Sequence, residues 1–311
     1  MNVDTPVLTR STKQPLQVLL NVIRGGLIAM AELVPGVSGG TIALVVGIYE
    51  RALFAGNQLI STAKTAVTHP KLAAEKLREV DWWLLIPVGV GMILTVFGMA
   101  GVMHDFVEHH PEVSRALFMG MVAVSIIVPV RMADRADFKA KAIVAVPMML
   151  LAAAVTFWGT GFTSAERQDP SLLIIFGAAA IAICALVLPG VSGSFFLLAV
   201  GLYAPVIGAI KDRDITVILV FALGAMTGIA LFIRLLNYLL EHHRTVTLFT
   251  MAGLMLGSMR ALWPWQSSDA ALLAPADNAV KIFGFMALGA AIVALTIIAE
   301  KYAPAPGAKH E

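Results

Sequence analysis

Long apolar stretches constrain this chain more than any other feature of its sequence. Each is roughly 18–23 residues long, about the length that a helix needs to cross a bilayer. We expect full membrane spans at Trp82–Met103, Val113–Val130, Ala140–Trp158, Ile215–Leu236, Thr245–Leu262 and Ala279–Ile298. Only 14% of the 311 residues are charged, against about 25% in soluble domains. Because lipid cannot satisfy an open backbone, these stretches predict helices.

Two further apolar regions are interrupted by turn-forming residues. Leu16–Leu59 is broken at Pro35-Gly36-Val37-Ser38-Gly39-Gly40, and Leu172–Ile210 is broken at Pro189-Gly190-Val191-Ser192-Gly193-Ser194. Proline and clustered glycines stop helices, and each flanking arm is marginal in length for a span. We therefore expect two re-entrant helical hairpins, whose non-helical tips lie inside protein or face water.

The two halves of the chain resemble each other. Pro35–Tyr49 aligns with Pro189–Tyr203 at an offset of 154 residues. Further along, Gly91 and Gly120 align with Gly224 and Gly253 at an offset of 133. Each half then holds one hairpin and three spans. Three is odd, so the second half enters the membrane from the opposite side, as in many alternating-access transporters.

The sequence thus predicts an all-α polytopic membrane protein with an inverted-topology repeat. Each half is a re-entrant helical hairpin plus three transmembrane helices. We place a cytoplasmic N-terminal tail at residues 1–15 and the first repeat at 16–160. The second repeat covers 170–300, and a cytoplasmic C-terminal tail covers 301–311.

Loop charges orient this topology. Fourteen lysines and arginines fall on the side of the N-terminus and five on the opposite side, with three more inside apolar segments. The positive-inside rule then puts both termini in the cytoplasm. Asn57–Val80 is a polar, basic connector on that side, which is either a helix on the membrane surface or a solvated loop.

The twin motifs suit an anion. We expect a helix to begin after each, from Thr41 and from Phe195, and a helix N-terminus carries roughly half a positive charge. Glycines let a ligand approach the backbone, and hydroxyls add donors. The alternative is that these small residues only allow close helix packing. The predicted substrate-binding residues in the motifs are Gly36, Ser38, Gly39, Gly40, Thr41, Gly190, Ser192, Gly193 and Ser194.

Four charged residues fall inside apolar sequence, where they are costly and usually functional. Arg24 and Glu32 are eight residues apart, on nearly one helix face, and Glu32 stands just before the first motif. Glu32 either pairs with an arginine or carries a proton. Arg115 and Arg234 lie near span ends, where they either contribute to the site or only reach toward water. We include all four among the substrate-binding candidates.

Other chemistry is poorly supported. Cys184 is the one cysteine in the sequence, so a disulfide or a cysteine metal site within the chain is excluded. The histidines match no metal-binding spacing, and the sequence contains no nucleophile triad and no phosphate-binding Walker loop. We expect no catalytic residue, no cofactor, no metal and no nucleic-acid partner.

The motifs also resemble a known family. Pro35-Gly-Val-Ser-Gly-Gly-Thr with Gly47-Ile-Tyr-Glu-Arg51, and Pro189-Gly-Val-Ser-Gly-Ser with Gly201-Leu-Tyr203, are similar to the bacterial polyprenyl-phosphate transporter family (PopT). The resemblance extends from about Leu16 to Ile298. It implies flipping of undecaprenyl phosphate across the bacterial cytoplasmic (inner) membrane, which recycles the carrier lipid of cell-envelope synthesis.

Three functions remain open on the sequence alone. The favoured one is a lipid-phosphate translocase that works by alternating access around a midplane phosphate site, with protons or another ion as possible coupling species. The second is a small-anion carrier or channel on the same scaffold. The third is an intramembrane phosphatase or transferase, which would need a nucleophile and a general base near the motifs, where no histidine lies close in sequence.

Overall fold

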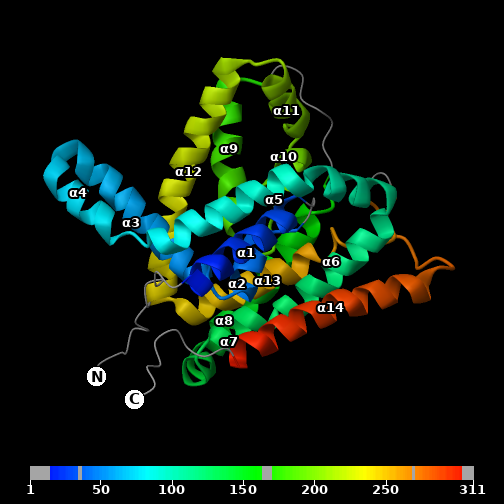
Figure 1. The fold of residues 1–311 in the computed structure, drawn as a ribbon. Helices are drawn as coiled ribbons and strands as arrows, with labels where there is room; N and C mark the ends of the chain where they lie inside the picture. Colours follow the sequence, from blue (N-terminus) through cyan, green and yellow to red (C-terminus); the bar gives the residue numbers. More distant parts are fainter. Residues whose placement is uncertain (1–14, 34–36, 163–169, 268–269, 303–311) are drawn as a thin grey trace.

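The computed structural model describes residues 15–33, 37–162, 170–267 and 270–302. In these ranges the chain forms helices, turns and one isolated bridge between Gln266 and Leu272. The helices are α1 (Pro15–Glu32), α2 (Gly39–Val45), α3 (Tyr49–Thr68), α4 (Pro70–Glu79), α5 (Trp82–His109), α6 (Pro111–Ser125), α7 (Ile127–Met132), α8 (Arg135–Gly159), α9 (Leu172–Val187), α10 (Gly193–Ala199), α11 (Tyr203–Lys211), α12 (Ile215–His242), α13 (Arg244–Ser258) and α14 (Ala279–Tyr302) (Figure 1).

Five of the six predicted spans are confirmed as helices long and apolar enough to cross a membrane. They comprise Trp82–Met99, Pro111–Met132, Arg135–Gly159, Ile215–His242 and Ala279–Ile298. Many of their side chains are exposed on the outside of the bundle, as expected where lipid is the surrounding solvent. The protein is therefore an all-helical, multi-pass membrane protein.

The prediction of a sixth full span at Thr245–Leu262 is wrong in length. Helix α13 has 15 residues and rises about 22 Å, less than the roughly 30 Å of a bilayer core. After Ser258 the chain tightens into successive turns, in which the Arg260, Ala261 and Leu262 amides each bond three residues back. Most of α13 is buried, so this helix lies inside the bundle, where it need not match the thickness of the lipid.

Both hairpins differ from the prediction in their returning arms. We expected one continuous helix after each motif, but each arm is broken again at a glycine with positive φ, Gly47 at 69° and Gly201 at 73°. The break bends α2 against α3 by 117°. Glycine adopts this left-handed conformation without steric cost, which is why the helix stops there. The predicted connector Asn57–Val80 is largely helical, as the end of α3 and the whole of α4.

Corresponding elements of the two halves match closely. Helices α5 and α12 both have 28 residues and both begin after an aspartate N-cap, Asp81 and Asp214, whose carboxylates accept amide hydrogens of the first turn. Helices α6 and α13 both have 15 residues. Helix α2 corresponds to α10, each with seven. The halves are thus alike in structure as well as in sequence, and their inversion across the membrane stays a prediction.

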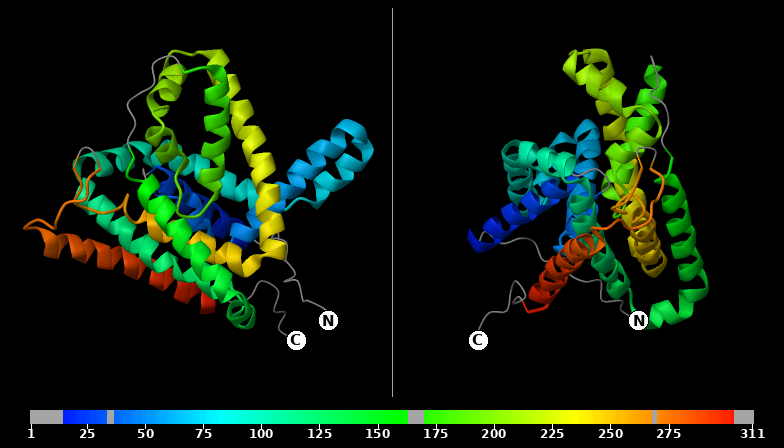
Figure 2. Two further views of the ribbon diagram at one scale, coloured as in Figure 1. Left: turned by 180° about the vertical axis from the view of Figure 1, so that it is seen from behind. Right: turned by 90° about the vertical axis from the view of Figure 1, so that its right-hand side faces the viewer.

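Four closely packed helix pairs organise the bundle: α1 with α5, α9 with α12, α6 with α14, and α8 with α13. In Figure 1, α9 and α12 rise together from the rest, and Figure 2 shows α6 and α14 side by side. The last two pairs each join one predicted half to the other. The halves have therefore exchanged their final helices and interlock.

Glycines set the distance within every pair. A Cβ at Gly91 of α5 would collide with the Val22 carbonyl of α1, and one at Gly224 of α12 would collide with Phe176 of α9. The equivalent glycines Gly120 and Gly253 meet α14 and α8 in the same way. Small residues allow membrane helices to approach this closely.

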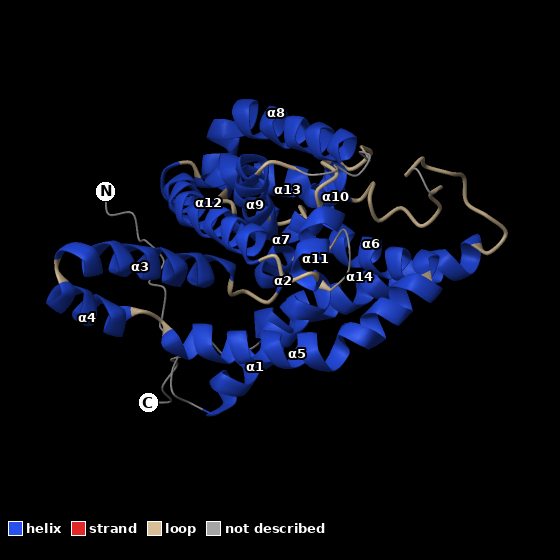
Figure 3. Cartoon of the chain, turned by 90° about the horizontal axis from the view of Figure 1, so that it is seen from above, coloured by secondary structure: helices blue, strands red, loops and turns tan. Residues whose placement is uncertain are grey.

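The core surrounds α2, whose residues from Thr41 to Val45 are all buried. The main apolar cluster joins α2 to side chains from α1, α5, α6, α12 and α13. Helices α3 and α4 form a hairpin that projects away from this core (Figure 3). The first motif therefore leads directly into the centre of the molecule.

Substituting Gly91→Ala tests the glycine packing. Because the added methyl would strike the α1 backbone, the pair must separate, and overpacking of this kind costs about 1–3 kcal/mol. The matched control is Gly98→Ala on the same helix, which meets nothing within 4 Å. Thermal unfolding of the purified proteins in detergent should show a midpoint below that of the wild type for Gly91→Ala but not for Gly98→Ala. Equal midpoints for the two variants would contradict the packing role of Gly91.

Candidate functional site

The two motif turns have the same backbone conformation. Ser38 has φ −111° and ψ 125°, and Ser192 has φ −107° and ψ 126°. Each serine is the N-cap residue of the helix that follows, so the helices begin at Gly39 and Gly193, two residues before the predicted starts. Pro35 and Gly36 lie outside the described residues, so the predicted role of Gly36 stays a prediction.

The structure brings the two motifs together although about 150 residues separate them in sequence. The Ser38 hydroxyl donates to the Leu188 carbonyl at 3.0 Å. The Gly190 amide donates to the Thr41 hydroxyl at 2.9 Å. Ser38 and Thr41 are almost fully buried. Polar groups of each turn thus satisfy those of the other, and the two tips are in direct contact.

Close approach at this contact requires glycine. A Cβ at Gly40 would come within 2.7 Å of the Val187 carbonyl oxygen on the chain leading to the second turn. Gly190 has φ +83° and sits against the backbone of Met255 on α13. A larger residue at either position would push the turns apart or strain the backbone.

Glu32 closes the first turn. Its carboxylate accepts a hydrogen bond from the Gly39 amide at 2.6 Å. A charged acceptor makes this a stronger bond than a neutral pair. Among the described residues no arginine forms an ion pair with Glu32, so the arginine pairing, one of the two alternatives for this residue, is not observed. The carboxylate stands where an anionic oxygen of a ligand would meet the Gly39 amide.

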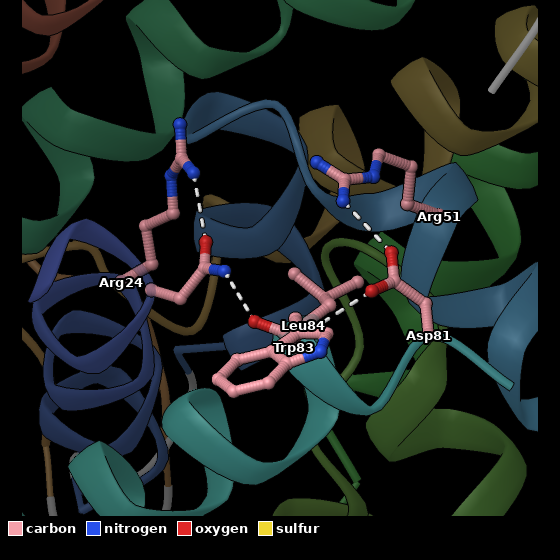
Figure 4. Close-up of polar contacts among 6 residues, drawn as sticks. Arg24, Arg51, Asp81, Trp83 and Leu84 are labelled. Carbon is pink, nitrogen blue, oxygen red and sulfur yellow. Dashed lines mark hydrogen bonds and ion pairs between the residues drawn. The ribbon is translucent and has the colours of Figure 1, made fainter. Parts of the chain in front are cut away.

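Arg24 lies two turns earlier on α1, in a separate polar cluster (Figure 4). Its guanidinium donates to the Asn21 side-chain oxygen at 2.9 Å, and the Asn21 amide donates to the Trp83 carbonyl at 2.8 Å. Asn21 is fully buried. This network joins α1 to the start of α5. Arg24 and Glu32 therefore share a helix but have different partners.

Arg115 and Arg234 are partly buried on α6 and α12. Within the described ranges, neither guanidinium makes a hydrogen bond or ion pair with a motif residue. The structure thus does not join these two arginines to the motif contact, and their role in binding stays a prediction.

The second motif uses its hydroxyls differently from the first. Ser192 and Ser194 hydrogen bond to each other at 3.0 Å, and the Ser192 oxygen also accepts the Phe195 amide at 3.5 Å. Gly193 packs against the Ala182 carbonyl of α9. The contact between the turns is therefore asymmetric, because the hydroxyls that cross it both belong to the first motif.

Sequence reasoning missed several residues that hold the site. The Tyr49 hydroxyl donates to the Val187 carbonyl at 3.1 Å, and its ring is buried. Its alignment with Tyr203 in the repeat was a signal that could have identified Tyr49. Arg51 pairs with Asp81 at 2.8 Å (Figure 4), and Glu50 pairs with Arg244 at 2.8 Å. These pairs tie the start of α3 to α5 and α13, and spacing alone did not indicate them.

An apolar cavity of about 340 Å³ lies beside the first motif. Ala31 and Ile42 line it, each one position from Glu32 or Thr41, together with Met103, Phe118 and Val293 from α5, α6 and α14. The site therefore combines a polar contact between two turns with an apolar space next to it. Within the described ranges, groups of three potential metal-ligating side chains are absent.

The sequence is similar to known proteins over most of its length. The sequence is 32% identical over 250 residues to a polyprenyl-phosphate transporter of Vibrio cholerae, which covers 80% of this chain and 79% of the relative. It is 28% identical over 271 residues to a polyprenyl-phosphate transporter of Staphylococcus aureus, which covers 79% of this chain and 86% of the relative. No solved structure matches.

The family match covers more than half of the chain and both motifs. Residues 28–280 match the family described as VCA0040-like, undecaprenyl phosphate translocase-like. A match of this extent includes the first motif, the exchanged helix α8 and the whole of α13. The chain therefore belongs to the undecaprenyl phosphate translocase-like family.

Proposed function

We propose that this protein flips undecaprenyl phosphate to the cytoplasmic leaflet of the bacterial cytoplasmic membrane, by alternating access around the two motif turns. The observation that carries the proposal is the direct contact between these turns at the centre of the bundle. Its family membership and its relatives, both named polyprenyl-phosphate transporter, support the substrate. The function is transport, with no chemical change to the lipid.

The turns offer a phosphate three donors, one hydroxyl and two backbone amides. They are the Ser38 hydroxyl, the Gly39 amide and the Gly190 amide. In the described arrangement these donors bond to Leu188, Glu32 and Thr41. A phosphate oxygen is a stronger acceptor than a carbonyl or a hydroxyl. When the turns separate slightly, the headgroup takes over these donors, so that few of them are left unpaired.

The asymmetry of the contact suggests how access alternates. Tyr49 is 5% exposed and reaches across to Val187, whereas its counterpart Tyr203 is 42% exposed. In an inverted repeat, exchanging the conformations of the two halves opens the site to the other side of the membrane. The interlocked pairs α6–α14 and α8–α13 connect the halves during this exchange. With the positive-inside orientation, both termini face the cytoplasm.

The apolar cavity favours a lipid over a free anion. Its lining beside Glu32 and Thr41 suits an isoprenoid chain whose phosphate lies between the turns. A small-anion carrier, the second candidate, has no use for an apolar space of about 340 Å³ next to its binding site. Arg24, Arg115 and Arg234 then attract the headgroup as it enters the protein.

Reconstitution separates the two candidates. Purified protein in liposomes should move polyprenyl phosphate between leaflets, because the turns accommodate the headgroup and the neighbouring apolar cavity accommodates the chain. The same liposomes should not accumulate inorganic phosphate. Protein-free liposomes provide the control. Phosphate uptake without lipid movement would reject the lipid-flipping proposal in favour of the small-anion carrier.

Ser38→Ala tests the contact between the turns. Loss of this hydroxyl removes a donor that phosphate would use, and a hydrogen bond to a charged group is worth enough to slow flipping roughly tenfold or more. The matched control is Ser114→Ala. Ser114 is equally buried and also donates to a backbone carbonyl, that of Pro111, but it lies outside the motifs. Equal loss in both variants would assign Ser38 a purely structural role.

Glu32→Gln tests proton coupling. If the Glu32 carboxylate leaves the Gly39 amide by taking up a proton, a pH gradient drives flipping in the wild type and not in the variant. Glu112→Gln is the control, since this glutamate on α6 accepts a hydrogen bond from Asn278, just before α14, and does not contact a motif. Flipping should be measured in liposomes with and without a pH gradient. A gradient response unchanged in Glu32→Gln would rule out the proton role.

A further inference from the structure

We propose a second binding site for the same lipid, at the end of α13, where the guanidinium of Arg260 holds the phosphate and a neighbouring groove holds part of the isoprenoid chain. This inference rests on the proposed function. The site would hold the lipid before or after it occupies the motif turns. None of its residues was a candidate in the sequence analysis.

An apolar groove of about 480 Å³ carries the first part of the argument. It lies between α6, α8, α13 and the segment after α13. Its walls include Met119, Ala153, Phe157, Leu256 and Leu272. Phe157, Leu256 and Leu272 are each 40–44% exposed, so the groove opens to the outside of the bundle. A flexible hydrocarbon chain can enter it sideways from lipid.

Arg260 supplies a single charge at this apolar groove. Its guanidinium lies 5.4 Å from the centre of the Phe157 ring, and one nitrogen donates to the Ala270 carbonyl at 3.2 Å. Within the described ranges, no carboxylate lies at ion-pair distance from it. Arginine carries five donors in a planar fork that matches a phosphate. Described residues take up one of these donors, the one bonded to Ala270, and the others can bind an anion.

The surrounding chain holds the guanidinium in place. A Cβ at Gly161 would collide with it, so glycine at this position leaves the space that the side chain occupies. The Gln266 side chain donates to the carbonyls of Arg260, Ala261 and Trp263 at 2.7–3.1 Å. These bonds fix the turn that presents Arg260. The position of the charge is therefore built into the fold.

The same end of the bundle carries aromatic residues typical of a membrane interface. Trp158 is 68% exposed, and the half-buried Trp263 lies edge-on to the buried Trp265, with 5.4 Å between the ring centres. Tryptophan prefers the headgroup level of a bilayer. Arg260 is thus at the depth where a lipid phosphate lies, while the groove reaches toward the hydrocarbon.

Helix α13 connects this site to the motif turns. Met255 packs against Gly190 of the second motif, and the next residues, Leu256 and Gly257, line the groove. Arg260 follows two residues after α13 ends at Ser258. A lipid in the groove is therefore separated from the second turn by the thickness of one helix. This continuity favours the transported lipid over an ordinary phospholipid as the occupant.

Binding and transport measured on the same variants test the proposal. A photoreactive residue at Leu256 in the full-length protein should cross-link to radiolabelled undecaprenyl phosphate. Farnesyl phosphate should compete, whereas farnesol and phosphatidylglycerol should not. Arg260→Gln should weaken cross-linking about tenfold and raise the half-saturating lipid concentration for flipping by a similar factor, with Arg260→Lys intermediate. Gln266→Ala, which loosens the same turn and keeps the charge, should lose clearly less than Arg260→Gln in both measurements.

The outcomes distinguish failure of the second site from failure of the proposed function. If wild-type protein flips the lipid and Arg260→Gln matches it in both measurements, the second site is rejected and the proposed function stands. Equal competition by phosphatidylglycerol would also reject the site, because the occupant would be any anionic lipid. If Gln266→Ala loses as much as Arg260→Gln, Arg260 only supports the turn. If the wild type does not flip the lipid at all, the proposed function itself fails.

Discussion

The need to satisfy backbone and hydroxyl groups at two non-helical turns governs this structure. Inside a membrane bundle, an unpaired polar group costs several kcal/mol, and water is not available to pair it. Here each turn uses the other, through Ser38 to Leu188 and Gly190 to Thr41. The two motifs must therefore meet, and the helices that carry them must surround that meeting point.

The exchange of final helices follows from the same constraint. A half-chain alone would leave one side of its motif turn exposed to lipid. By pairing α6 with α14 and α13 with α8, the two halves form one packed bundle around the turns. Glycines at the crossings, such as Gly120 and Gly253, let backbones touch closely enough to exclude lipid. Packing and the polar contact thus support each other.

The functional proposals follow from charged groups whose present contacts a ligand could replace. The Glu32 carboxylate accepts the Gly39 amide hydrogen, and an anionic ligand could replace it there. Arg260 is a cation beside an apolar groove, with one bond to a carbonyl and a contact to an aromatic ring. Both lie along elements that touch the motif turns. A lipid with a phosphate headgroup matches this combination of charge and apolar space.

The sequence by itself determined the features that depend on local pattern. Hydrophobic length predicted five spans correctly, and the aligned motifs from Pro35 and Pro189 indicated a repeat whose halves are alike in structure. Only the tertiary structure decided which helices pair across the halves, because such contacts depend on shape over long sequence separations. It also decided that Glu32 bonds to the Gly39 amide and not to Arg24, and that α13 ends at Ser258. Both depend on burial and on the neighbouring backbone, which hydrophobic periodicity does not encode.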